Sequence, residues 1–309
     1  TNLMTSKNSI SAYYFPTTPF LIDDDPDFSK GCLSYFENRP MPFTFTNPAE
    51  AINFLKKSYS SALPIDHYMI TNNKTKYEHS AMEFDIFSLH QISHNPRRFA
   101  EIAVIFADYS MPRLTGVDFF KQLSPSAFKK VLLTGQATKE EGINAFNAKI
   151  IDQFIEKQSK LDDHINPVFN MLEKNYFIYR SSNIIHSLAK DKTSAIGEVQ
   201  FERLFYKVLN ENKIVEYYLV SKSGCFLMFD FSGTPSWIII KSEDDMAYYQ
   251  QSAKDNDAPI SIQNKLKSQE YVLFLYSPQD DDAPHDQWDQ YLHKATLLQG
   301  DKNKFYYTY

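Results

Sequence analysis

Residues 102–112 read IAVIFADYSMP, an apolar run that ends at Asp108 and passes into a polar turn with a proline. A short apolar run bounded by a polar loop is typical of a strand that is buried on both faces of a parallel sheet. We therefore predict a strand over residues 102–107, with Asp108 at its carboxyl end.

Similar runs occur along the first half of the chain. They are residues 20–22, 41–45, 131–133 and 150–155. Segments with apolar residues at helical spacing separate or follow them, at residues 27–37, 48–59, 116–123 and 139–147. Alternating strands and helices indicate a parallel sheet with helices on both faces. The first half is thus predicted to be an α/β domain with a five-stranded, doubly wound parallel sheet.

The second half has a different pattern, because strand-like runs follow one another with turn signals and few helices between them. These runs are residues 215–220, 225–231, 237–241 and 271–276. The pattern predicts an α+β domain with a mainly antiparallel sheet.

The length of 309 residues suggests two domains. We expect a flexible N-terminal arm over residues 1–17, because this segment is polar. The α/β domain is expected to span residues 18–160, with an insertion at about residues 60–100 where the alternation of strands and helices breaks. Residues 161–189 are expected to form a long helix or linker, and residues 190–309 the α+β domain.

Composition excludes several classes of protein. Hydrophobic residues make up 43% and charged residues 23% of the chain, ordinary values for a soluble globular protein. Two cysteines are too few for a disulfide framework or a multi-cysteine zinc site. The sequence shows neither a signal peptide nor an apolar run long enough to span a bilayer. These features predict a cytoplasmic protein without a membrane partner.

The charge argues against direct binding of nucleic acid. Net charge is −6, and residues 181–309 carry 13 Lys and Arg against 18 Asp and Glu. A protein that grips a phosphate backbone is usually basic, at least locally. The second half also lacks the compact three-helix pattern that places a recognition helix in the major groove.

Side chains with complementary chemistry follow four of the predicted strands. They are Asp23 with Asp24, Asp108, Thr134 and Lys157. The carboxyl ends of strands in an open parallel sheet form a common crevice, so these side chains should share one pocket. Grouped carboxylates suit Mg²⁺, and one of them can act as a nucleophile that forms an aspartyl phosphate. A hydroxyl and an ammonium group can hold further phosphoryl oxygens.

The motifs around these residues resemble the receiver domain of two-component response regulators over residues 18–178. The resemblance rests on FLIDDDPDF at residues 20–28, ADYSMP at 107–112, LTG at 133–135 and FIEK at 154–157. The motifs occur in the family's order, with spacings of 26 residues (108 to 134) and 23 residues (134 to 157). The resemblance implies a flavodoxin-like fold and a role in a phosphorelay.

Carried over by position, the resemblance implies a role for each site residue. Asp108 would accept the phosphoryl group, and Lys157 would contact it. Asp24 and Asp108 would bind Mg²⁺ directly, together with the backbone carbonyl of Ser110. Asp23 would act on the metal through a bound water.

The resemblance also implies a switch and its partners. Thr134 would bind the phosphoryl group, and the ring of Phe154 would reorient behind it. A sensor histidine kinase is the implied phosphodonor, and a phosphorylation-dependent homodimer is the implied response. The receiver would catalyse its own phosphoryl transfer and autodephosphorylation, and the second half shows no motif for a separate enzymatic activity.

Two features depart from the family. The separation of 84 residues between Asp24 and Asp108 (108 − 24) is longer than usual because of the insertion. Lys157 is followed by Gln158 where the family has proline, and a cis bond without proline would cost about 2.5–4 kcal/mol. The second departure leaves open a pseudo-receiver, an interaction scaffold that takes no phosphoryl group. A nucleotide-binding or enzymatic second half under receiver control is the other alternative.

More narrowly, residues 95–99 (NPRRF) and the second half resemble a small group of bacterial quorum-sensing regulators. Other polar clusters have ordinary structural explanations. We expect the insertion's histidines to be solvated or hydrogen-bonded rather than metal-bound; they are His67, His79, His90 and His94. The acidic runs at residues 243–245 and 280–282 are expected in loops or at helix starts.

Overall fold

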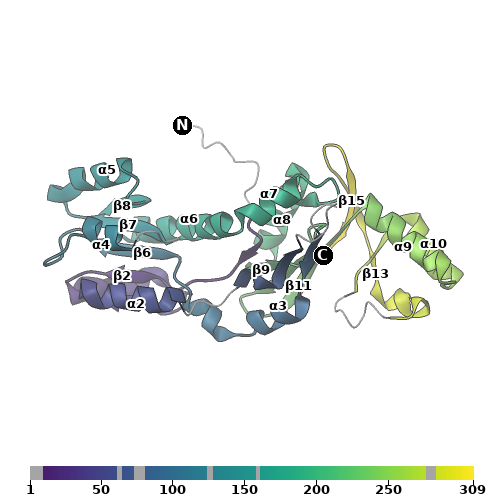
Figure 1. Ribbon diagram of the computed structural model, residues 1–309, viewed down its shortest axis with the longest axis horizontal. Helices are drawn as coiled ribbons and strands as arrows, with labels where there is room; N and C mark the ends of the chain where they lie inside the picture. The colour runs from purple at the N-terminus through teal and green to yellow at the C-terminus, as the bar shows by residue number, and fades with distance from the viewer. Residues whose placement is uncertain (1–9, 61–64, 73–80, 124–127, 158–160, 276–282) are drawn as a thin grey trace. The chain divides into compact units, whose positions relative to one another are not determined.

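The computed structural model describes residues 10–60, 65–72, 81–123, 128–157, 161–275 and 283–309. These residues form two compact units (Figure 1). The α/β unit consists of the described parts of residues 15–64 and 93–180. The α+β unit consists of the described parts of residues 1–14, 65–92 and 181–309.

The α/β unit contains a five-stranded sheet in the order β3-β2-β6-β7-β8. The strands are β2 (Phe20–Ile22), β3 (Phe43–Phe45), β6 (Val104–Asp108), β7 (Lys129–Thr134) and β8 (Gln153–Glu156). Every neighbouring pair is parallel. The predicted five-stranded, doubly wound α/β fold is therefore confirmed.

Helices cover both faces of this sheet. They are α1 (Pro26–Cys32) with the 3₁₀ turn η1 (Leu33–Phe36), α2 (Pro48–Ser60), α4 (Gly116–Gln122), α5 (Lys139–Asn147) and α6 (Asp162–Arg180). Phe106 in the middle of β6 lies against Phe36 and Phe169, with ring centroids 5.8 and 6.3 Å away. Its neighbours Ile105 and Ala107 point to the other face and join the core beneath α2 and α4. Burial on both faces explains why the sequence of β6 is continuously apolar up to Asp108.

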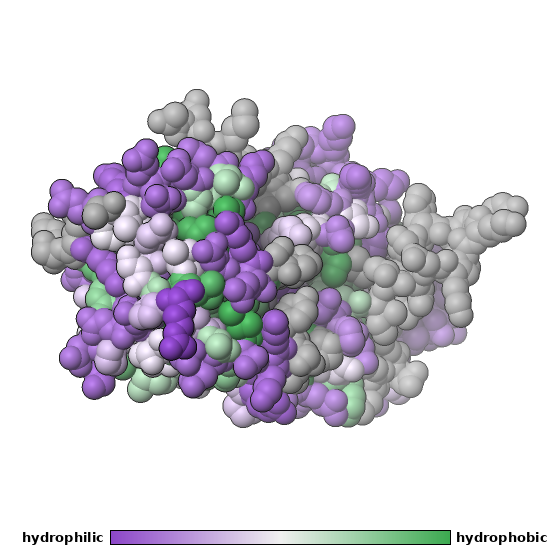
Figure 2. All heavy atoms as spheres, turned by 60° about the vertical axis from the view of Figure 1, so that its left-hand side comes forward, coloured by the Kyte–Doolittle hydropathy of each residue, from purple (hydrophilic) through white to green (hydrophobic). Residues whose placement is uncertain are grey.

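Most of the coloured surface in Figure 2 is hydrophilic, with smaller hydrophobic areas between the hydrophilic side chains. Two apolar side chains of α5 remain accessible, since Ile143 is 40% and Phe146 is 45% exposed. None of the described helices is both long enough and apolar enough to cross a membrane.

The α+β unit contains a six-stranded sheet in the order β1-β9-β10-β11-β15-β14, and every neighbouring pair is antiparallel. The strands are β1 (Tyr13–Tyr14), β9 (Ile214–Leu219), β10 (Phe226–Asp230), β11 (Pro235–Ser242), β14 (Thr296–Gln299) and β15 (Lys304–Thr308). Helix α8 (Val199–Glu211) packs on this sheet through Phe205, whose ring centroid lies 4.8 Å from Phe226 and 4.9 Å from Tyr217. The predicted α+β fold with an antiparallel sheet is confirmed.

Shorter elements complete the α+β unit. They are η2 (Ile65–Tyr68), the pair β4 (Met69–Asn72) and β5 (Ala81–Phe84), α3 (Ile86–Ser93), α7 (Ser182–Ala189), η5 (Ala195–Gly197), α9 (Glu243–Asp255), α10 (Ile260–Ser268), β12 (Tyr271–Leu273), η7 (His285–Tyr291) and β13 (Leu292–Lys294). A separate small core around Leu266 and Trp288 holds α9, α10 and η7 together.

The N-terminal segment differs from the flexible arm predicted over residues 1–17. Residues 1–9 lie outside the described part of the chain, but Tyr13 and Tyr14 form β1, the edge strand of the antiparallel sheet. Tyr13 pairs with Tyr218 and is fully buried, as is Phe15. A polar composition predicted an arm because the partner strand lies about 200 residues later, where no local pattern reveals it.

The boundaries between the units also differ from the predicted ones. The described residues of the insertion, 65–72 and 81–92, belong to the α+β unit, where the ring of Tyr68 lies 6.4 Å from that of Tyr218. The chain therefore passes between the units four times, after residues 14, 64, 92 and 180. The predicted long helix over residues 161–189 consists of α6 and α7, which are separated at Ser181.

Candidate functional site

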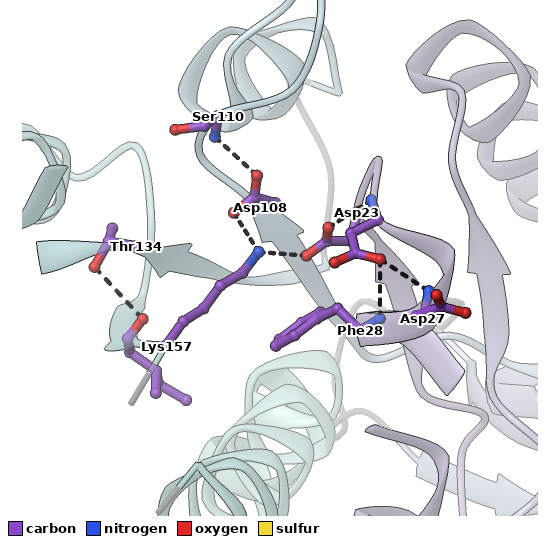
Figure 3. Close-up of polar contacts among 9 residues, drawn as sticks. Asp23, Asp27, Phe28, Asp108, Ser110, Thr134 and Lys157 are labelled. Carbon is purple, nitrogen blue, oxygen red and sulfur yellow. Dashed lines mark hydrogen bonds and ion pairs between the residues drawn. The ribbon is translucent and has the colours of Figure 1, made fainter. Parts of the chain in front are cut away.

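Four strands of the α/β unit carry the predicted site residues to the same edge of the sheet (Figure 3). Asp108 is the last residue of β6 and Thr134 the last residue of β7. Asp23 directly follows β2, and Lys157 directly follows β8. Because parallel strands end at a common edge, side chains far apart in sequence can meet there.

Three carboxylates form one cluster. Asp23, Asp24 and Asp108 each offer an oxygen, and these oxygens lie within 4.8 Å of one another. Asp23 is fully buried and Asp108 is 5% exposed, while Asp24 faces solvent. Hard oxygen donors of this kind suit Mg²⁺ or Ca²⁺, and the exposed side of the cluster leaves room for water ligands. Among the described residues this is the one group of three or more potential metal ligands.

Lys157 holds two of these carboxylates together. Its Nζ atom lies 2.6 Å from Oδ2 of Asp23 and 2.8 Å from Oδ1 of Asp108. The same ammonium group lies over the ring of Phe28, 4.2 Å from the centroid. A single cation is thus surrounded by two anions and one aromatic face, as Figure 3 shows.

The protonation equilibria follow from this arrangement. Burial raises the pKa of Asp23, and the opposing hydrogen bonds from Lys157 and a backbone amide do not fully offset it. Burial alone would lower the pKa of Lys157, but its hydrogen bonds to Asp108 and Asp23 outweigh that effect and raise the pKa. Lys157 therefore stays charged at neutral pH, and the site always contains one fixed positive charge.

Backbone amides fix the orientation of both buried acids. The Asp25 amide donates to Oδ1 of Asp23 at 2.9 Å, and the Ser110 amide donates to Oδ2 of Asp108 at 3.0 Å. Asp25 in turn caps α1, since its side chain accepts from the amides of Asp27 and Phe28. The acids are thus oriented before any ligand binds, which favours pre-organised catalysis.

Gly116 lets the chain pass close behind Asp108. A Cβ atom at this position would lie 2.4 Å from the Asp108 carbonyl oxygen and 2.7 Å from Cδ1 of Leu132. The Gly116 amide also donates to the Tyr109 carbonyl at 3.0 Å, which closes the loop after Asp108. Only glycine has room for this close approach.

Thr134 and Phe154 lie side by side beneath α5. Thr134 is fully buried, and its hydroxyl donates to the Ile155 carbonyl across 3.5 Å, at the outer limit of a hydrogen bond. A Cβ atom on Gly142 of α5 would lie 3.1 Å from the Phe154 ring and 3.2 Å from the Thr134 methyl group. The absence of a side chain at Gly142 therefore allows α5 to rest on both residues.

Several sequence-based expectations concern other positions. Gln158, which replaces the family's proline, lies outside the described residues, as do His79 and residues 280–282. The acidic run at residues 243–245 begins α9, where Ser242 and Asp245 form a capping box. This run therefore has the structural role that was predicted for it.

Two contributors to the site were not predicted from the sequence. Phe28 is an aromatic residue in a helix, and nothing local indicates that its ring faces a lysine. Gly142 is an isolated glycine in a helical pattern, which signals a possible packing role without naming the partner.

Comparisons with known proteins gave structural matches alone, because no family model and no curated protein sequence matches the chain. The response regulator LqsR of Legionella pneumophila is 28% identical, with a TM-score of 0.73, and the match covers 97% of this chain and 89% of that one. A receiver domain from Vibrio parahaemolyticus is 13% identical over 53% of this chain and 95% of its own, with a TM-score of 0.36. The TM-score of the Vibrio domain is too low to support a conclusion about this chain.

The LqsR comparison covers both units and not merely the parallel sheet. Two features of this chain itself accompany the match. They are the sheet order β3-β2-β6-β7-β8 and the acidic cluster at the carboxyl ends of its strands. The chain is therefore similar to a response regulator over nearly its whole length, and its α/β unit has the fold of a receiver domain.

Proposed function

We propose that this protein is a cytoplasmic phosphorelay response regulator that takes a phosphoryl group onto Asp108 in the presence of Mg²⁺. The observation that carries the proposal is the double contact of Lys157 with Asp23 and Asp108, next to the solvent-facing carboxylate of Asp24. A nucleophile, a metal-binding cluster and a fixed cation are thus present at one point.

The chain's own residues account for the transfer step. A carboxylate oxygen of Asp108 attacks the phosphorus of a phosphohistidine on a sensor kinase, so that an acyl phosphate forms and the P–N bond breaks. The departing imidazole keeps the electron pair and takes up a proton. Lys157 and the hydroxyl of Thr134 each bind one phosphoryl oxygen.

The acidic cluster fits a divalent cation. Asp24 and Asp108 would hold Mg²⁺ directly, with the backbone carbonyl of Ser110, and Asp23 would act through a water. When bound, the metal offsets negative charge on the transferring phosphoryl oxygens. This offset matters because Asp23 and Asp108 already bring two buried carboxylates to the site.

The switch is the second part of the proposal. The weak 3.5 Å contact of Thr134 leaves its hydroxyl free to turn toward a phosphoryl oxygen. Phe154 would then move into the space that Thr134 vacates, and α5 would shift because Gly142 rests on both. The exposed Ile143 and Phe146 on α5 are suited to a homodimer contact that forms in response.

Phosphorylation by acetyl phosphate, phosphoramidate and a sensor kinase, each with Mg²⁺, tests the proposal by intact mass. We expect the full chain to gain one phosphoryl group, Asp108→Asn to gain none, and Asp163→Asn, an exposed aspartate on α6, to behave as wild type. EDTA should abolish the gain. Light scattering on the same samples should show a dimer that forms with phosphorylation.

A pseudo-receiver remains the competing hypothesis, and Gln158 after Lys157 is the feature that favours it. Failure of all three donors to modify the wild-type chain would support the scaffold. Incorporation that persists in Asp108→Asn would show that another residue is modified and would also overturn the proposal.

A further inference from the structure

The contact between Phe28 and Lys157 takes no direct part in the transfer step or in metal binding. Phe28 belongs to the first turn of α1, and its half-buried ring lies under the Lys157 ammonium at 4.2 Å from the centroid. Distances within about 6 Å allow a cation–π attraction, which strengthens when the cation is removed from water. Lys157 meets this condition because its side chain is only 23% exposed.

The ring is held in place by the acidic cluster itself. Asp23 accepts a hydrogen bond from the Asp25 amide at 2.9 Å, and Asp25 accepts one from the Phe28 amide at 3.2 Å. Pro26, at the start of α1, restricts the backbone between them. The aromatic face is therefore fixed relative to the carboxylate that Lys157 contacts.

An aromatic face does something for the ammonium that a third carboxylate would not. It attracts the cation without adding negative charge to a site that must accept a phosphoryl group. The attraction is not a directed hydrogen bond, so it does not prevent the N–H group that contacts Asp108 from exchanging to a phosphoryl oxygen. The same contact can thus persist before and after the transfer.

A contact that restrains Lys157 matters in this chain because the residue after Lys157 is not a proline. Proline fixes its own backbone angle and limits the residue before it, and Gln158 does neither for Lys157. A lysine side chain has several freely rotating bonds, and ordering it costs conformational entropy. A fixed aromatic face 4.2 Å from the ammonium reduces the orientations that Lys157 can adopt.

We propose that Phe28 is a positioning residue that orients Lys157 for phosphoryl transfer through a cation–π contact. The inference rests on the proposed function, since it concerns the rate of modification at Asp108. It differs from a packing role, because packing depends on the size of the ring and the cation–π contact depends on its electron density.

Fluorination separates the two roles, since it withdraws electrons from the ring with little change in size. Phenylalanine analogues with one, two and three fluorine atoms would replace Phe28 in the full chain, and the phosphorylation rate with phosphoramidate would be measured at saturating Mg²⁺. We expect the rate to fall stepwise, by about two- to fivefold in total. The same series at Phe231, which is 72% exposed in the α+β unit, should leave the rate unchanged.

Two natural variants complete the experiment. Phe28→Tyr should keep most of the wild-type rate, and Phe28→Leu should lose at least as much as the most fluorinated ring. A flat fluorine series on a chain that is phosphorylated at Asp108 would overturn the role of Phe28 and leave the proposed function intact. If the wild-type chain takes no phosphoryl group from any donor, both proposals fail together.

Discussion

Replacement of Lys157 by methionine tests the electrostatics of the acidic site. Methionine keeps much of the length of the side chain but removes the charge that lies 2.6 Å from Asp23 and 2.8 Å from Asp108. The variant leaves a fully buried carboxylate and a nearly buried one as neighbours without a cation between them. Folding must then either keep two like charges together in a region poor in water or protonate one of them.

The expected loss of unfolding free energy in Lys157→Met depends on how far Lys157 is exposed to solvent. Removing one partner of a buried ion pair costs about 3–5 kcal/mol of unfolding free energy. Lys157 retains 23% exposure, so solvent screening lowers the expected loss to about 2–4 kcal/mol at pH 7 without divalent cations. The control Lys139→Met breaks the pair with Glu156, whose lysine is 54% exposed, and should cost less than about 1 kcal/mol.

The loss of unfolding free energy in Lys157→Met should become smaller as the pH is lowered. Burial already raises the pKa of Asp23 in the folded state, and removal of Lys157 should raise that pKa further. The folded variant then binds more protons than the unfolded chain between the ordinary Asp pKa of about 3.9 and the raised folded pKa. Stability in this window falls as pH rises, so the deficit should be largest at neutral pH and should shrink as the solution is acidified.

The assay must report on the receiver domain. Trp237 and Trp288 both lie in the α+β unit, so tryptophan fluorescence would follow the wrong part of the chain. Hydrogen exchange of receiver peptides during denaturation measures the relevant free energy. A Lys157→Met variant within about 0.5 kcal/mol of wild type at pH 7, with no dependence on acidification, would refute the electrostatic account of the site.

Three further substitutions test other parts of the receiver domain. Gly116→Ala places a Cβ atom 2.4 Å from the Asp108 carbonyl oxygen, so it should destabilise the receiver by about 1–3 kcal/mol in hydrogen exchange and slow phosphorylation. Gly142→Ala favours helix by about 1 kcal/mol but crowds the Phe154 ring at 3.1 Å, so stability should change little while phosphorylation no longer alters exchange in α5. Glu173→Gln removes the charge of a fully buried carboxylate that pairs with Arg39 and should cost about 3 kcal/mol in the same exchange assay, whereas an unchanged stability would show that the buried charge is dispensable.

The sequence was most informative where the chemistry of a residue and its place in the fold coincide. The strands β2 and β6 and residues 131–133 of β7 are buried, so each is an apolar run that ends where a polar side chain begins. The same end of the strand is where a parallel sheet places its ligand. One pattern therefore indicated the fold and the positions of Asp108 and Thr134 together.

Local sequence patterns did not predict the contacts between segments that are far apart in the chain. Phe28 and Lys157 are separated by 129 residues (157 − 28), and each is unremarkable in its own segment. The edge strand β1 consists of Tyr13 and Tyr14, and two residues are too short for any periodicity to indicate a strand. What makes them a strand is the backbone of β9, which offers an unpaired edge about 200 residues later.

The connectivity of the units limits how the protein can be divided for experiments. The sequence predicts residues 190–309 as the whole second domain, but a fragment with these bounds would lack β1 and the insertion residues of the α+β unit. Tyr218 of β9 is fully buried, and both Tyr13 and Tyr68 contact it or pair with it. Their removal would expose aromatic surface and an unpaired sheet edge, which together favour aggregation. A failure of such a fragment to bind a nucleotide would therefore say little about the second half, and ligand screens need the full chain.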